Sequence, residues 1–121
     1  MTITLADSSA IPAYGEIWLA DLNPVRGREQ RGRRPVLVVS PDRLNRGPLL
    51  IAVPFTRTAR GTPFHVPVEP PEGGLRDVSY AMCEQVRTLS RERLSRPWGE
   101  VSTSTMGEVA RRLHLLMPAP S

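Results

Sequence analysis

Thirteen prolines divide the 121-residue chain into short apolar runs, and this spacing limits the fold more than any other feature. Proline fixes φ and lacks a backbone donor, so it stops helices and is confined to the ends, edges and bulges of strands. Nearly all of these prolines lie between the apolar runs rather than inside them. The pattern therefore predicts short strands joined by structured turns and argues against a helical bundle.

Seven strands are predicted from short apolar or alternating runs that end in turn residues. They cover residues 16–21, 36–39, 49–55, 64–68, 78–83, 85–89 and 98–101. The strands at 78–83 and 85–89 could equally be one bent strand, and 90–94 could form one helical turn. The longest run, 49–55, is expected to be a central strand, with a bulge or an edge near Pro54.

One helix is expected at the C-terminus, where Thr105 and Glu108 have the spacing of a capping box. Apolar residues fall on one face of this helix, and they are Met106, Val109, Ala110, Leu113, Leu116 and Met117. Pro118 ends the helix. We therefore expect a mainly β (α+β) fold, a small β-barrel with one helix packed on it. Residues 14–118 are expected to form a single domain, and residues 1–13 a flexible N-terminal extension.

The chain has no lysine, so all 16 strongly basic side chains are arginines, against 12 carboxylates, and the net charge is +4. The planar guanidinium group suits bidentate binding of phosphate. Nucleic acid is therefore the first partner to consider, although a solvated basic surface without a ligand is the alternative interpretation. Aromatic residues make up only 5% of the chain, which weighs against a platform of exposed rings for stacking bases.

The cysteine content and the lack of long apolar segments indicate a cytoplasmic protein. Cys83 is the only cysteine, so an internal disulfide is excluded, and its apolar neighbours predict a buried side chain. The N-terminus lacks the pattern of a signal peptide, and no apolar stretch approaches the roughly 20 residues that span a bilayer.

Metal and histidine chemistry are not supported by the sequence. Histidine, cysteine and carboxylate residues do not cluster at the spacing of metal ligands, so neither a metal nor another cofactor is expected. We interpret His65 and His114 as structural residues. An acid–base ribonuclease built on two histidines is therefore not supported.

The segment 26–40, RGREQRGRRPVLVVS, is the strongest candidate for a functional site. It contains five arginines, two glycines and one carboxylate, Glu29. Because Pro35 pushes the preceding residue toward extended conformations, Arg34 should stand where the loop meets the strand. A fixed arginine at that junction is suited to holding a scissile phosphate. The alternative is a solvated basic loop in which Glu29 merely pairs with a neighbour.

Three segments, in the same order and with similar gaps, resemble the MazF/PemK/Kid family of toxins. The first joins residues 15–21 to the pattern G-x-E-Q-x-G-x-R-P-V-L-V-V at 27–39, the second is VPFT at 53–56, and the third is EQVRTLSRERL at 84–94. The resemblance covers about residues 14–117. One departure lies before Ser79, where the family usually has an acidic residue and this chain has Val78.

The resemblance implies a homodimer of SH3-like barrels that cleaves single-stranded RNA, such as messenger RNA, at short sequence motifs. It implies 2′,3′-cyclic phosphate and 5′-hydroxyl ends, made without a metal. The catalytic arginine and threonine of the family fall on Arg34 and Thr56. The residues implied to contact RNA are Glu29, Gln30, Ser79, Glu84 and Gln85. Arg57 adjoins Thr56 and is expected to grip a flanking phosphate. The implied protein partner is a MazE-like antitoxin with an acidic, disordered tail.

Elementary chemistry assigns separate roles to the two catalytic candidates. Arginine loses its proton only with difficulty, so Arg34 is expected to act chiefly as a fixed cation on developing negative charge. Thr56 would orient the phosphate or the 2′-hydroxyl, whereas the alternative is a strand-end threonine with a local hydrogen bond. Glu29 is a candidate for the general base.

A protein-binding toxin of the same fold is the alternative function, as in the CcdB group that poisons DNA gyrase. The arginine-rich first loop favours the nuclease, because the gyrase poisons lack it. Those poisons also rely on a tryptophan-glycine-isoleucine chain end, whereas this chain ends in Pro-Ala-Pro-Ser at 118–121.

Overall fold

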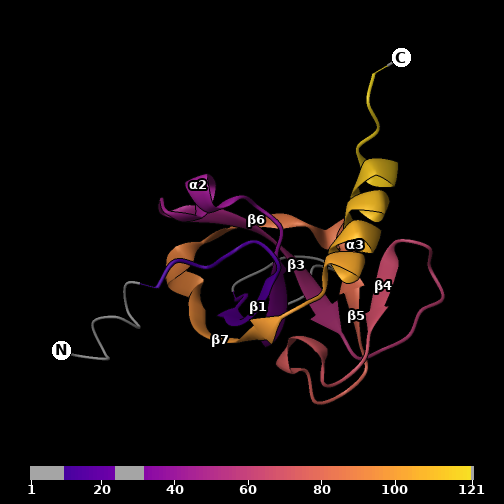
Figure 1. Cartoon of the computed structure of the whole chain (residues 1–121), viewed down its shortest axis with the longest axis horizontal. Coiled ribbons are helices and arrows are strands. Elements are labelled where there is room, and N and C mark those ends of the chain that lie inside the picture. The colour runs from indigo at the N-terminus through magenta and orange to yellow at the C-terminus, as the bar shows by residue number, and fades with distance from the viewer. Residues whose placement is uncertain (1–9, 24–31, 121) are drawn as a thin grey trace.

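The computed structural model describes residues 10–23 and 32–120, which form a curved β-sheet with a helix at the C-terminal end (Figure 1). The strands are β1 (Glu16–Asp21), β2 (Arg33–Val38), β3 (Leu49–Thr56), β4 (His65–Val68), β5 (Ser79–Met82), β6 (Arg87–Ser90) and β7 (Leu94–Glu100). The helices are α2 (Asp42–Asn45) and α3 (Thr103–Leu116), and the single 3-10 turns are η1 (Glu72–Gly74), η2 (Cys83–Gln85) and η3 (Arg91–Arg93).

The strands pair antiparallel in the order β4-β5-β3-β2-β1-β7, and β6 pairs with the first half of β3. The central strand β3 thus changes partner along its length, from β6 at 49–52 to β5 at Phe55 and Thr56. Pro54, which has no N–H to donate, lies at this change. The predicted mainly β fold with a packed C-terminal helix is confirmed, but among the described residues hydrogen bonds do not close the sheet into a barrel.

Both faces of the β1–β2 region are buried, which explains the nearly continuous apolar run of β2. Successive side chains of a strand point to opposite faces. Ile17 and Leu37 accordingly belong to one core cluster, which also contains Met106 and Val109 of α3. Trp18 belongs to a second cluster, with Val36, Val38 and Leu50 among its members. Helix α3 contributes to the first cluster and contacts β4 and η2.

The start of α3 corrects the predicted capping box. The N-cap is Ser102, whose Oγ accepts the N–H of Thr105 at 3.1 Å. Thr105 instead donates its hydroxyl to Glu72 Oε2 of η1 at 2.6 Å, and Glu108 pairs with the arginines at 111 and 112. Residues 102–105 are all serine or threonine, so their spacing alone could not identify the cap.

Helix α3 ends as predicted before Pro118, with Met117 as its C-cap. Met117 is 58% exposed, so its predicted place on the packed apolar face is wrong, whereas Leu113 and Leu116 pack against the core. Along the described ranges, no helix is long and apolar enough to cross a membrane.

Two strands begin earlier than the apolar pattern predicts. β2 begins at Arg33 rather than at residue 36, and β7 begins at Leu94 rather than at residue 98. β7 lies at the end of the strand order and, within residues 10–23 and 32–120, pairs with β1 alone, so Pro97 removes no hydrogen bond from a second neighbour there.

The N-terminal residues 1–9 of the predicted extension lie outside the described part of the chain. Before β1, the carbonyl of Pro12 accepts a hydrogen bond from Asn45 Nδ2 at 2.9 Å. Ala13 N donates to Glu16 Oε1 at 2.8 Å.

Candidate active site

Arg34 and Thr56 come from adjacent strands and line the same cavity, which has a volume of about 250 Å³. In the β2–β3 ladder, Val36 lies opposite Pro54. Extending this register by two residues along each antiparallel strand puts Arg34 level with Thr56, and directly opposite side chains share one face of a sheet. Thr56 is 5% exposed and Arg34 is half-buried. The structure therefore brings the two predicted catalytic residues together.

Four arginines and one carboxylate line this cavity within the described part of the chain. The charged residues are Arg33, Arg34, Arg57, Arg76 and Asp77, the hydroxyl residues are Thr56 and Ser79, and the apolar lining includes Leu19, Phe55, Leu75 and Trp98. A shallower hollow shares Arg34, Thr56 and Arg57 and adds Thr58 and Arg60. Such an excess of positive charge over a partly apolar floor favours an anionic ligand.

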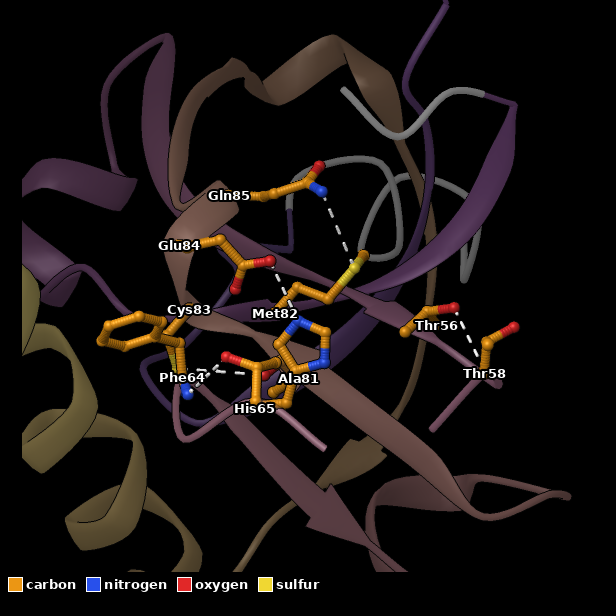
Figure 2. Close-up of polar contacts among 10 residues, drawn as sticks. Thr56, Thr58, Phe64, His65, Ala81, Met82, Cys83, Glu84 and Gln85 are labelled. Carbon is orange, nitrogen blue, oxygen red and sulfur yellow. Dashed lines mark hydrogen bonds and ion pairs between the residues drawn. The ribbon is translucent and has the colours of Figure 1, made fainter. Parts of the chain in front are cut away.

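Among the described residues, the hydroxyl of Thr56 has one hydrogen bond, in which its Oγ1 accepts the backbone N–H of Thr58 at 3.2 Å (Figure 2). This bond uses an oxygen lone pair and not the hydroxyl proton. Thr56 can therefore donate that proton to an oxygen atom in the cavity while the hydrogen bond to Thr58 holds its side chain.

Asp77 lies at the rim of the cavity, where its carboxylate pairs with Arg57 and not with the hydroxyl of Ser79. Arg57 Nη1 lies 3.6 Å from Asp77 Oδ2, and both side chains are more than half exposed. Such a pair contributes little to stability. Ser79 is buried and donates its Oγ–H to the carbonyl of Asp77 at 2.9 Å. Ser79 thus lines the cavity without an adjacent carboxylate, since Val78 precedes it.

Glu84 and Gln85 do not line this cavity. They belong to η2, which follows the last residue of β5, whereas Ser79 is the first residue of that strand. Glu84 Oε2 lies 2.9 Å from Nε2 of His65, and Gln85 Nε2 lies 3.8 Å from the sulfur of Met82 (Figure 2). Within one chain, two of the residues predicted to contact RNA therefore form a separate group.

His65, which the sequence predicted to be structural, is a buried residue of β4 that pairs with Glu84. Its side chain is 4% exposed and is held against Glu84, while its Nδ1 is buried without a hydrogen-bond partner among the described residues. His65 and Glu84 are 19 residues apart in the sequence, so no local pattern predicts their contact. Only the pairing of β4 with β5, in which His65 lies opposite Met82, brings them together.

Two further predicted residues, Glu29 and Gln30, fall in the range 24–31, outside the described residues. Within the described ranges, no three histidine, cysteine or acidic side chains gather in a group that could hold a metal ion.

Cys83 is buried, as predicted, and lies outside the cavity. Burial, helped by the nearby charge of Glu84 and opposed by Arg112, raises the pKa of its thiol to about 11. The thiolate needed for nucleophilic chemistry is therefore scarce at neutral pH.

Sequence reasoning did not assign Arg33, Arg76 or Trp98 to the cavity. Arg33 and Arg76 adjoin predicted site residues, so their position along the chain was the available signal. For Trp98 the sequence offered no signal, because its position in the cavity depends on the pairing of β7 with β1, which lies near the other end of the chain.

Comparison with known proteins identifies the family. The model of the PemK-like, MazF-like toxins of type II toxin–antitoxin systems matches residues 13–117. The chain belongs to this family. The resemblance predicted from the three sequence segments is thus confirmed, and the PemK/MazF match includes every strand and helix described above.

Individual members of the PemK/MazF family match along nearly their whole length. The endoribonuclease MazF9 of Mycobacterium tuberculosis is 38% identical over 110 residues, which cover 84% of this chain and 93% of the relative. A crystal structure of MazF from Deinococcus radiodurans superimposes with a TM-score of 0.81 at 31% identity, covering 91% of this chain and 99% of that one. An endoribonuclease in complex with its cognate antitoxin, from a mycobacterial species, gives a TM-score of 0.76 at 28% identity, covering 91% and 98%.

Proposed function

We propose that this chain is a cytoplasmic endoribonuclease toxin that cuts single-stranded RNA, such as messenger RNA, at short sequence motifs. The observation that carries the proposal is the shared cavity of Arg34 and Thr56, in which arginines outnumber carboxylates by four to one among the described residues. The endoribonuclease name of a relative that is 38% identical supports the same activity.

The proposed reaction is a transesterification that needs no metal. The ribose 2′-oxygen forms a bond to the adjacent phosphorus, and the bond from phosphorus to the 5′-oxygen breaks. The products are a 2′,3′-cyclic phosphate and a 5′-hydroxyl, to which the proton lost by the 2′-hydroxyl is finally returned. Negative charge builds on the phosphoryl oxygens and on the leaving oxygen, and these atoms need stabilisation.

In this proposal Arg34 supplies a fixed positive charge, and Thr56 supplies a hydrogen bond. The guanidinium of Arg34 faces the phosphoryl oxygens, and the hydroxyl of Thr56 donates to one of them while its own oxygen is held by Thr58. Arg57, which is exposed at the rim, contacts the flanking phosphate. Glu29 is the carboxylate proposed as general base, and Glu29→Gln should slow cleavage if it has that role. Unchanged cleavage by this variant would exclude it.

We further propose that an antitoxin with an acidic, disordered tail occupies the same basic cavity. The solved complex of a related endoribonuclease with its cognate antitoxin supports a partner of this kind. Because both ligands are anionic, RNA and antitoxin should exclude each other. Simultaneous binding without loss of affinity in a competition titration would contradict the proposal.

We also propose that the chain forms a homodimer. Leu115 and Met117 of the α3 region expose large apolar side chains, at 60% and 58%, which a second copy could cover. Sedimentation equilibrium should give twice the mass of one chain. A monomer at micromolar concentration would contradict this part of the proposal.

The activity is tested by incubating a long, weakly structured RNA with the protein in excess EDTA. The wild-type chain should give discrete fragments, and Arg34→Ala should cleave about 10²–10³ times more slowly. Arg43→Ala is the matched control, because it removes an exposed arginine that does not line the cavity. A folded wild-type protein that leaves several RNAs intact would favour the protein-binding toxin instead.

A further inference from the structure

A second hollow adjoins the catalytic cavity between η1 and β7. It has a volume of about 430 Å³ and is lined by Gly74, Arg76, Arg96, Pro97 and Trp98. Arg76 and Trp98 also line the catalytic cavity, so the two hollows share part of their walls. The two hollows therefore meet at Arg76 and Trp98.

The second hollow carries positive charge that nothing in the described structure neutralises. Arg76 and Arg96 are exposed, and among the described residues neither has a carboxylate partner or a side-chain hydrogen bond. None of the described residues that line the hollow is acidic. The nearest carboxylate in the adjoining cavity, Asp77, is already paired with Arg57. Two guanidinium groups are thus available to bind phosphate.

Trp98 is fixed at the boundary of the two hollows by close contact of two backbone segments. A Cβ atom on Gly74 would lie 2.2 Å from the carbonyl oxygen of Trp98, and a Cβ on Gly99 would lie 2.8 Å from the carbonyl carbon of Gly73. Glycine alone permits this approach, and Gly74 also has a φ of +76°. The half-buried indole packs against the core cluster while it lines both hollows. It is therefore a pre-positioned aromatic surface.

We propose that Arg76, Trp98 and Arg96 form a subsite for a nucleotide that flanks the cleaved bond, in which the arginines bind phosphates and the base stacks on the indole. The proposal rests on the proposed function, because it treats the adjoining cavity as the cleavage site. Stacking on an aromatic side chain accepts every base, so the subsite adds affinity without a sequence requirement. An aromatic ring that lines one hollow with two arginines, neither of them paired with a carboxylate among the described residues, fits a nucleotide better than an acidic peptide, which has no base to stack.

Binding of uncleavable probes tests the subsite independently of the reaction. The probes are mixed-sequence 2′-O-methyl oligoribonucleotides of about two and about six nucleotides, of which the longer is long enough to span both adjoining hollows. Arg96→Ala should weaken binding of the longer probe roughly tenfold relative to Arg43→Ala, which removes the same charge outside both hollows. For the longer probe, the slope of log K against log salt should also fall by about 0.7, the value for one phosphate contact.

Intrinsic fluorescence provides the readout that a charge effect alone would not produce. The chain has two tryptophans, and Trp18 is only 7% exposed within the second core cluster. In Trp18→Phe, where Trp98 is the remaining reporter, the longer probe should quench the emission more strongly than the shorter one. Trp98→Phe should lose this difference while it keeps the fold, as measured by circular dichroism.

The outcomes separate this inference from the proposed function. Equal binding of the longer probe by Arg96→Ala and Arg43→Ala, or no quenching of Trp98, would overturn the subsite even if the protein cleaves RNA. Absence of RNA cleavage by the wild-type chain would overturn the proposed function, while a length-dependent quench would still support a nucleotide subsite. Failure to bind either probe would contradict both.

Discussion

Replacing Thr56 by valine should abolish most of the activity at little cost in stability. Thr56 is 5% exposed, and valine keeps both its volume and its β-branched shape. The change removes one hydrogen bond, in which Thr56 Oγ1 accepts the N–H of Thr58 at 3.2 Å. Since Thr58 is itself exposed, water can replace the lost acceptor. We expect a loss of about 1 kcal/mol in the free energy of unfolding.

The effect of Thr56→Val on the reaction should be much larger than its effect on folding. Loss of a hydrogen-bond donor that stabilises a transition-state oxyanion typically slows a reaction about 10²–10³-fold, equivalent to about 3–4 kcal/mol. Thr56→Ser should lose a similar amount of stability but little activity, because it loses a buried methyl group and keeps the hydroxyl. Its unfolding free energy should also fall by about 1 kcal/mol, whereas its rate should stay within about tenfold of wild type.

Guanidinium unfolding and single-turnover RNA cleavage of the two variants, measured at one temperature, provide the comparison. Matched losses of stability combined with very different rates would support a chemical role for the hydroxyl. If Thr56→Val cleaves like the wild type, or if both variants lose activity in proportion to their stability, Thr56 is only a structural residue at the end of β3.

Three further outcomes follow from the packing and the pKa shifts. Gly74→Ala should lower the free energy of unfolding more than Gly61→Ala does in guanidinium melts. Both glycines have a positive φ, but of the two only Gly74 would bring its added Cβ against backbone, 2.2 Å from the carbonyl oxygen of Trp98. Equal losses of stability would contradict the close contact of η1 with β7. Cys83 should resist iodoacetamide at about pH 8 until the protein unfolds, since burial raises its pKa to about 11, and rapid labelling followed by mass spectrometry would contradict this. Burial works to raise the pKa of Glu72, but hydrogen bonds from Thr105 and Ser102 together lower it below the ordinary value. A lowered pKa means that the carboxylate stabilises the fold above the ordinary pKa and loses this effect as the pH falls through the lowered one. The stability difference between wild type and Glu72→Gln, measured in urea, should therefore shrink between about pH 7 and about pH 3, and a constant difference would contradict it.

The sequence predicted those elements whose signal is local. The range predicted for β1, 16–21, is the one observed, because buried and partly exposed side chains mix along it in a strand pattern. The start of β7 was missed because Arg96 and Pro97 interrupt the apolar pattern, which an edge strand with a single neighbour tolerates. The N-cap of α3 was missed because four successive hydroxyl residues could each serve as the cap. Hydrogen bonds from Ser102 N and the Thr105 hydroxyl to Glu72, some 30 residues away, accompany the observed cap.

The same division applies to the candidate site. Arg34 and Thr56 were found from motifs, and the register of β2 with β3 explains how residues 22 positions apart reach one cavity. The second hollow had no local signal, because Trp98 and Arg96 reach it only through pairing of β7 with β1 and contact with η1.

The central claim is that the residues of the Arg34–Thr56 cavity cleave RNA by transesterification. Analysis of the fragment ends tests this claim most directly. A single RNA would be cut by the wild-type chain in excess EDTA, and the two new ends of one fragment pair would be identified by mass spectrometry. The account predicts a 2′,3′-cyclic phosphate on one fragment and a 5′-hydroxyl on the other, with neither fragment formed at an appreciable rate by Arg34→Ala. A 5′-phosphate paired with a 3′-hydroxyl, or cleavage that disappears in EDTA, would contradict it.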